Sequence, residues 1–458
     1  MNIKHRNELR EKELEFGKEI FELIKNCYPI CRSITGNGVR ETLKILQQKI
    51  SLDINEIPTN TQCFDWKIPN EWNIKDAYII DPNGKKIVDF KKSNLHVVSY
   101  SIPINKKIKL SELKKHLHYL SDKPDHIPYR TSYYNEYWGF CITYNQFKNL
   151  SEGEYEVCID SSLKEGYLTY GEYFKQGKVK DEILFSCYVC HPSLCNDNLS
   201  GVGLVAILGK ILNKIPTYFS YRFLFIPETI GAIAWLSKNK ESVNNIKHGL
   251  VATCCGDRGT STYKKTRDGD NIIDDIVEQV LKDSGEPYEI LDFWPSGSDE
   301  RQFSSPGFNL PIGSLMRTLY DTFEEYHTSK DNLDFMDVNS LTNSLSKYLE
   351  IIYQLENNSN LNKKNHLKIT KISIENDPVF ISQNMKCESF LGKRNLYHKL
   401  GALTNQNNLE VKRAIQWIMN FSDGYHSLND ISKKSGMNLI ILNDAVNLLK
   451  NVNLLKEQ

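Results

Sequence analysis

The sequence feature that most constrains the fold is an alternation of short apolar runs with helical patterns, which begins near Val179. Apolar runs of strand length, bounded by turn residues, occur at Ile183–Val189, Phe223–Ile226, Leu250–Thr253 and Ile312–Leu315. Residues with helical spacing occur at Gly201–Leu212, Ile272–Asp283 and Val338–Glu356. Because strands that alternate with helices form sheets covered on both faces, this part predicts an α/β fold with a mixed, largely parallel sheet between helices.

A helical region precedes this part of the chain. Apolar residues with helical spacing occur in Phe16–Ile24, and Tyr28–Ile30 interrupts that pattern. Glycines at Gly36 and Gly38 mark a turn before a second helical stretch, Val39–Ile50. The N-terminal region is therefore expected to form helix, turn and helix.

Residues 57–149 have a different composition: they are rich in Tyr, Trp, Pro and Asn, and short runs alternate between apolar and polar residues. Ala77–Ile80 and Lys86–Phe90 are two such runs, and Asp81-Pro82-Asn83-Gly84 lies between them. Asn-Gly between two alternating runs is a strong signal of a β-hairpin, because such turns need residues that tolerate positive φ. This stretch predicts a small β-rich domain.

A polar segment at residues 357–362 precedes a third region with a different sequence pattern. Three short helical patterns follow it, at Leu409–Phe421, Leu428–Ser435 and Leu439–Asn451. The helix-turn-helix spacing between Ile431 and Leu442 indicates a winged-helix module. Its expected recognition region, residues 438–444, is apolar and contains Asp444, whereas phosphate contacts need a basic surface. We expect packing or dimerisation here, and no nucleic-acid contacts.

The composition excludes several function classes. With 57 basic and 57 acidic residues in 458, the net charge gives no indication of a nucleic-acid or membrane partner. No apolar run reaches the roughly 18–20 residues that span a bilayer, and the polar N-terminus lacks a signal peptide. Eleven cysteines, with Cys254 and Cys255 adjacent, then indicate reduced thiols and a cytoplasmic location.

The most informative segment for chemistry is Cys190–Gly203, which follows the apolar run that ends at Val189. In parallel α/β sheets, ligands sit beyond the carboxyl ends of strands. His191 lies at such an end and Asp197 lies just before a helical pattern. Imidazole and carboxylate are ligands of zinc hydrolases, which leave one position open for water. Taken alone, either residue is equally well explained as a loop residue or a helix cap.

Suitable groups recur after other apolar runs of the same predicted sheet. Glu228, Asp257 and His327 each follow such a run. Two histidines and three carboxylates at strand ends predict a metal centre with a catalytic carboxylate, against the alternative that all five are structural loop residues. The candidate metal ligands are His191, Asp197, Asp257 and His327, and the candidate catalytic residue is Glu228.

Three segments of this region are similar in sequence to the motifs of a known family. They are Asn196-Asp197-Asn198-Leu199-Ser200-Gly201, Ser298-Asp299-Glu300-Arg301-Gln302-Phe303 and Tyr326-His327-Thr328-Ser329-Lys330-Asp331. They resemble the co-catalytic zinc exopeptidases, the superfamily of bacterial leucyl aminopeptidases and glutamate carboxypeptidase. The resemblance covers roughly Asp181 to Glu356 and implies a zinc cofactor.

Three further segments give a narrower resemblance. They are Tyr28-Pro29-Ile30-Cys31-Arg32-Ser33-Ile34-Thr35-Gly36, Cys190-His191-Pro192-Ser193 and Pro227-Glu228-Thr229-Ile230-Gly231. They are similar to bacterial aminopeptidase-like domain proteins that are linked with surface-polysaccharide loci. This resemblance implies the domain order: residues 1–56 and 150–360 form the zinc aminopeptidase-like domain, 57–149 an inserted β-rich domain, and 365–458 a winged-helix domain.

One position departs from the exopeptidase pattern. Where that family has Glu-Glu, this chain has Glu228-Thr229 after Pro227. In the family, the first Glu is the general base and the second binds the second zinc. The place of Gly231 favours Glu228 as the base, which leaves one zinc site expected and a second open. If Glu228 aligned with the ligand instead, the base would fall on Pro227.

The resemblance implies a zinc-dependent hydrolase of aminopeptidase or amidase type. Metal-activated water would attack an amide carbonyl of a small peptide, amino-acid conjugate or amino-sugar derivative. Candidate substrate contacts are Arg301, Tyr263, Arg267 and Arg317, although surface arginines are usually only solvated. Two rivals stay open: a metal-retaining, catalytically silent binding protein linked to surface-polysaccharide biosynthesis, and a regulator that acts through its winged helix. A homo-oligomer is compatible with each.

Overall fold

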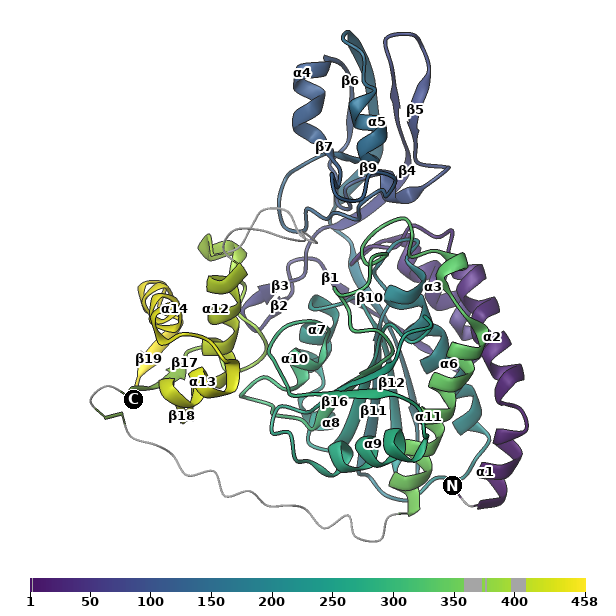
Figure 1. Cartoon of the computed structure of the whole chain (residues 1–458), viewed down its shortest axis with the longest axis vertical. Helices are drawn as coiled ribbons and strands as arrows, with labels where there is room; N and C mark the ends of the chain where they lie inside the picture. The colour runs from purple at the N-terminus through teal and green to yellow at the C-terminus, as the bar shows by residue number, and fades with distance from the viewer. Residues whose placement is uncertain (2, 358–372, 375–376, 397–408) are drawn as a thin grey trace.

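An eight-stranded mixed sheet forms the centre of the structure (Figure 1). The structure is a computed structural model, and it describes residues 1, 3–357, 373–374, 377–396 and 409–458. In spatial order its strands are β1 (Asp53–Pro58), β10 (Tyr167–Lys175), β12 (Ser220–Ile226), β11 (Glu182–Tyr188), β13 (Ile246–Ala252), β16 (Ile312–Met316), β14 (Ser261–Lys264) and β15 (Tyr288–Leu291). Strands β12, β11, β13 and β16 are parallel, whereas β10 and β14 join them antiparallel. The predicted mixed, largely parallel α/β sheet is confirmed.

Helices cover both faces of this sheet, because alternate residues of its buried strands point to opposite sides. Phe185 and Cys187 of β11 join one apolar cluster, and Leu184 and Tyr188 join the other. The first face is covered by α2 (Glu13–Cys27), α3 (Asn37–Gln47), α6 (Gly201–Asn213), α9 (Ile272–Asp283) and α11 (Val338–Asn357). The second face carries α7 (Ile230–Lys238) and α10 (Glu300–Phe303), and the chain also has α1 (Ile3–Arg10) and α8 (Lys240–Val243).

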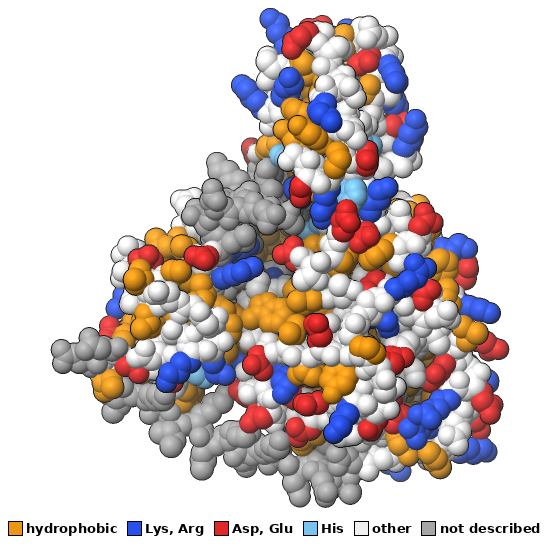
Figure 2. All heavy atoms as spheres, viewed as in Figure 1, with side chains coloured by type: hydrophobic (Ala, Val, Ile, Leu, Met, Phe, Trp, Pro, Cys, Tyr) orange, Lys and Arg blue, Asp and Glu red, His pale blue; other side chains and the backbone are white. Residues whose placement is uncertain are grey.

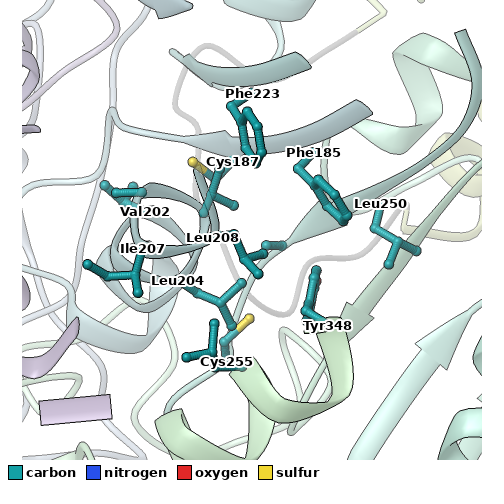
Figure 3. Packing of buried hydrophobic residues seen from close by; sticks show 14 of the residues in the cluster. Phe185, Cys187, Val202, Leu204, Ile207, Leu208, Phe223, Leu250, Cys255 and Tyr348 are labelled. Carbon is teal, nitrogen blue, oxygen red and sulfur yellow. The ribbon is translucent and has the colours of Figure 1, made fainter. Parts of the chain in front are cut away.

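Helix α6 is buried, and it directly follows the turn that contains Asp197. Its sequence is apolar on all sides, as expected for a helix enclosed by other elements. Figure 3 shows Leu204 and Leu208 of this helix beside Phe185 of the sheet and Tyr348 of α11, in the same apolar cluster. A Cβ added at Gly203 would lie 2.9 Å from Cγ2 of Ile20, so this glycine allows α2 to approach closely.

The small domain projects from the α/β domain between β1 and β10 (Figure 1). Its sheet has the order β5 (Lys86–Asp89), β4 (Glu71–Ile80), β9 (Glu154–Lys164) and β6 (Ile104–Lys109). Its other elements are β2 (Gln62–Cys63), β3 (Trp66–Lys67), β7 (Leu117–His118), β8 (Phe140–Cys141), α4 (Leu110–Leu113) and α5 (Tyr144–Lys148). The predicted hairpin is confirmed as β4–β5, with Gly84 at φ +80° in its turn.

The small sheet extends past residue 149, where the sequence analysis ends the β-rich domain. Strand β9 pairs with both β4 and β6 over Glu154–Lys164. Only this long-range pairing assigns β9 to the small sheet, because its own sequence carries no mark of its partner. The chain returns to the large sheet at β10.

The C-terminal domain contains three helices and a small sheet. The helices are α12 (Leu409–Phe421), α13 (Leu428–Ser435) and α14 (Leu439–Asn451), and the strands are β17 (Val379–Ser382), β18 (Asp423–Ser427) and β19 (Leu455–Glu457). Ser427 and Asp430 form a capping box that starts α13, and Gly436 at φ +67° ends it. All three predicted helices are confirmed, whereas residues 358–362 of the predicted polar linker lie outside the described residues.

Within the described part of the chain, no helix combines the length and the apolar composition needed to cross a membrane.

We expect Leu208→Ala to lower the free energy of unfolding of the α/β domain by about 2–5 kcal/mol, because it leaves a cavity between α6 and the sheet. Leu208 is fully buried, whereas Leu14 of α2 is 48% exposed. Leu14→Ala is the matched control and should change stability by less than about 0.5 kcal/mol. Urea unfolding of both variants measures the difference, and equal losses would contradict this packing.

Candidate functional site

The candidate residues meet at the carboxyl end of the parallel strands. His191 follows β11, Glu228 follows β12, and His327 lies in the loop after β16. Asp197 lies in the turn Cys195–Ser200 that leads into α6. The site therefore has the position that ligands take in parallel sheets.

His191, Asp197 and His327 each direct a ligand-type atom to one point. Nε2 of His327 lies 3.0 Å from Oδ2 of Asp197, and Nε2 of His191 lies 3.8 Å from the same oxygen. Within this group, Oδ2 of Asp197 and Nε2 of His327 are buried and have no hydrogen-bond partner. Buried polar atoms are normally satisfied, so this convergence fits a cation held between them.

The donor set also fits the expected metal. Two imidazoles and one carboxylate are a known ligand set of catalytic zinc, which keeps a further position open. Burial lowers the pKa of His191 to about 4, so its imidazole is neutral and able to bind a metal near neutral pH. Burial opposes ionisation of Asp197, but His191 and His327 outweigh it and lower the pKa of this carboxyl to about 2.

A second acidic residue holds the segment that carries Asp197. Oδ1 of Asp331 accepts a hydrogen bond of 2.6 Å from the backbone N of Asn196, and its Oδ2 accepts one of 2.9 Å from the backbone N of Asp197. The hydroxyl of Tyr188 donates to Oδ1 of Asp197. Asp197 is thus fixed from two sides, and Oδ2 is the oxygen left for a ligand.

The structure does not bring Asp257 into this group, contrary to the predicted ligand set. Both of its oxygens are occupied: Oδ2 accepts from Nδ2 of Asn196 at 2.9 Å, and Oδ1 accepts from the backbone N of Gly259 at 2.6 Å and from the hydroxyl of Thr318. Asp257 therefore orients Asn196, the neighbour of Asp197. The ligand-type atoms that converge in this region form two groups of three, which share His191: one with Asp197 and His327, and one with Cys190 and Glu228.

Glu228 lies at the open side of the group. Its Oε2 is 3.8 Å from Nε2 of His191, and its side chain keeps 26% of its surface exposed. Burial of the carboxyl, followed by the nearby Asp299, raises the pKa of Glu228 well above its usual value. The raised pKa favours the protonated carboxyl in this environment, and it makes the ionised form a stronger proton acceptor than an ordinary carboxylate.

Thr229 is the residue that stands where a second carboxylate is expected if Glu228 matches the first Glu of the exopeptidase pair. Its backbone has φ 64°, which is unusual for a β-branched residue. Asp299 accepts a hydrogen bond of 2.7 Å from its backbone N, and Arg301 donates one of 2.7 Å to its hydroxyl. These contacts hold Glu228 in place and leave Thr229 no role as a ligand.

Two residues outside the predicted set also position the site. Nε of the buried Arg32 donates to the carbonyl oxygen of His191 at 3.0 Å, which gives the Tyr28–Gly36 motif a role. The ring of Tyr129, from the small domain, lies 5.2 Å from that of His191 and 5.3 Å from that of His327. The only indication of Tyr129 in the sequence is the Tyr-rich composition of residues 57–149, which does not single out this residue.

A cavity of about 510 Å³ opens beside the group, and its walls come from all three domains. Of the predicted substrate contacts, only Arg301 lines it. The hydroxyl of Tyr263 donates to Asp274 in the core, Arg267 bonds Asp423 of the C-terminal domain, and Arg317 bonds Asn343 of α11.

Comparisons with known proteins fit this geometry. Residues 21–358 match a family described as "Domain of unknown function (DUF4910)", and residues 379–457 match a winged helix-turn-helix family. A protein of Clostridium acetobutylicum named "Putative polysaccharide biosynthesis protein with aminopeptidase-like domain" is 50% identical over 450 residues, which cover 98% of this chain and 99% of that protein.

Solved structures show the same fold. The crystal structure of a "putative peptidase" from Clostridium acetobutylicum has a TM-score of 0.77 at 48% identity, with 100% of both chains covered. BSAP, a zinc aminopeptidase from Bacillus subtilis, has a TM-score of 0.55 at 12% identity, with 75% of this chain and 96% of that chain covered.

The fold and the site define an aminopeptidase-like protein with a C-terminal winged helix. The chain belongs to the DUF4910 family, whose match includes His191, Asp197, Glu228 and His327.

We expect His327→Ala to abolish tight binding of Zn²⁺, because it removes one of three convergent ligands. Asp257→Asn is the matched comparison: it should keep one Zn²⁺ per chain but weaken binding by about 10–100-fold, as expected when a group that orients a ligand is changed. Competition against a chromophoric chelator measures both affinities. Equal zinc binding by His327→Ala and the unmodified protein would contradict a metal site at this position.

Proposed function

We propose that this protein is a zinc-dependent hydrolase that cleaves an amide bond at a single metal site. The observation that carries the proposal is the convergence of His191, Asp197 and His327 on one point, with the unpartnered, buried Oδ2 of Asp197 and Nε2 of His327 among their atoms. Glu228 supports it, because this carboxylate lies next to the group and at the cavity.

His191, Asp197 and His327 would hold the metal. A bound zinc ion would supply Lewis acidity, which lowers the pKa of water and polarises a carbonyl group. We favour a single ion because the two groups of converging ligand-type atoms share His191 and neither includes Asp257. In this structure Asp257 accepts hydrogen bonds from Asn196 and Thr318, and Thr229 accepts one from Arg301.

Glu228 would perform the proton transfers. Its carboxylate takes a proton from the attacking water at Oε2 and returns it to the nitrogen that leaves with the amine. Asp299 and Arg301 keep Glu228 in position through Thr229. Tyr129 packs against both histidines and limits the space for water on that side.

The substrate class we propose is a small peptide, an amino-acid conjugate or an amino-sugar derivative. The aminopeptidase-like fold supports amide cleavage, and the name of the relative from Clostridium acetobutylicum supports a link to polysaccharide biosynthesis. The rival reading, a metal-retaining binding protein without catalysis, differs in one respect: it needs no proton acceptor at position 228.

We expect Glu228→Gln to lower kcat/KM for aminoacyl anilides by about 10²–10⁴-fold, the usual contribution of a general acid–base group, while the zinc content stays at one per chain. Glu241→Gln changes an exposed glutamate of α8 and serves as the control. Release of the aniline product and elemental analysis provide the two readouts. Undiminished hydrolysis by Glu228→Gln would reject this mechanism, and no hydrolysis by the unmodified protein would favour the silent rival.

A further inference from the structure

We call His191, Asp197 and His327 the metal-type group. The C-terminal domain supplies one wall of the cavity beside this group. From α12, Ile415 and Met419 line this cavity, and so do residues 384 and 387–393 of the segment between β17 and α12. The same cavity is also lined by His191 and Glu228. The domain therefore reaches the space in which a substrate would lie.

Buried contacts fix α12 in this place. Arg267 of the α/β domain donates to Oδ1 of Asn420 at 2.8 Å and to Oδ2 of Asp423 at 2.5 Å. The side chains of Arg267 and Asp423 are only 2% and 4% exposed. Phe293 of the α/β domain packs into the core of the C-terminal domain against Phe421. The hydrophobic side chains that Figure 2 shows along the boundary of the two domains fit this docking.

The segment before α12 is attached to the α/β domain next to Glu228. Cys387 donates its backbone N–H to the hydroxyl of Ser305 at 2.9 Å, and Glu388 donates its own to the amide oxygen of Gln302 at 3.0 Å. Glu388 also accepts from Arg301 at 2.9 Å, the residue that holds Thr229. This wall is thus hydrogen-bonded to the residues that position Glu228.

The same segment joins the small domain through aromatic rings. Trp66 stacks on Phe390 with ring centres 4.4 Å apart, and Tyr134 lies 4.8 Å from Phe390. All three rings line the cavity, so they form an aromatic surface within it. Arg394 and Asp65 form an ion pair beside these rings.

Among the described residues of this domain, the outer surface of α14 is apolar and not basic. On α14, Leu439, Ile440 and Leu448 are exposed, and Lys450 is paired with Glu457 at 3.0 Å. Phosphate binding needs a basic surface instead.

We infer that the winged-helix domain recognises substrate: it selects amides that carry a ring with an apolar face, which packs against Met419 and the aromatic surface of Trp66, Tyr134 and Phe390. The cavity of about 510 Å³ exceeds what a minimal amide fills and falls within the roughly 300–1,000 Å³ of sites for drug-sized ligands. Aromatic walls favour flat ring faces. The ring can be aromatic or a pyranose. The amide part of the inference rests on the proposed function.

The test measures binding, so that it does not depend on turnover. Zinc-loaded Glu228→Gln protein is titrated by calorimetry with leucine 2-naphthylamide, with an N-acyl glucosamine and with glycinamide. We expect at least one ring-bearing amide to bind at least tenfold more tightly than glycinamide, and the tighter one identifies the ring. Adding Met419→Trp should weaken that binding at least tenfold, because the larger side chain fills the cavity. Gln416→Trp, at a partly exposed position of the same wall, repeats the test if Met419→Trp does not fold.

Ile440→Trp is the matched control, since Ile440 is 70% exposed on α14, and it should bind the ring-bearing amide like its parent. Equal affinity for all three amides, or unchanged affinity in both cavity variants, would overturn the inference, as would salt-sensitive binding of duplex DNA that Ile440→Trp abolishes. If the ring-dependent affinities hold but unmodified protein hydrolyses no amide, the recognition stands and the proposed function fails.

Discussion

Asp197 has a buried carboxylate oxygen that no hydrogen bond satisfies, and two histidine rings are aimed at it. Burying a carboxylate costs several kcal/mol unless a positive charge or hydrogen bonds compensate. The surrounding structure nevertheless fixes this oxygen in place through Asp331 and Tyr188. A bound cation would resolve the conflict, because it would satisfy the carboxylate and give both imidazoles a partner.

The three domains can be understood from this centre outwards. The parallel strands deliver His191, Glu228 and the loop of His327 to one edge of the sheet. The small domain adds Tyr129 against both histidines, and the C-terminal domain closes the cavity with α12. A winged helix whose inner surface faces the cavity beside His191 and Glu228 would have, under the proposed recognition, a use that needs no nucleic acid. Its docking through buried contacts agrees with that use.

Much of the fold could be predicted from sequence, because buried parallel strands are short apolar runs and α6, α9 and α11 have clear helical spacing. His191, Asp197 and His327 could be found because each follows such a run. Asp257 follows one too, but sequence does not show that Asn196 and Thr318 occupy its oxygens. The residues that line the cavity could not be predicted from the sequence either, because Trp66, Tyr134 and Phe390 come together only in the folded chain. The predicted contacts Tyr263, Arg267 and Arg317 are polar groups that serve the core and the domain boundary.

The central claim is one metal ion held by three residues. The most direct measurement is anomalous diffraction at the zinc edge from crystals grown with Zn²⁺. The account predicts one strong peak within about 2.0–2.2 Å of Nε2 of His327, an oxygen of Asp197 and a ring nitrogen of His191, the usual zinc distances to nitrogen and oxygen. A peak bound by Asp257, two peaks of equal strength, or no peak at this edge of the sheet would contradict it.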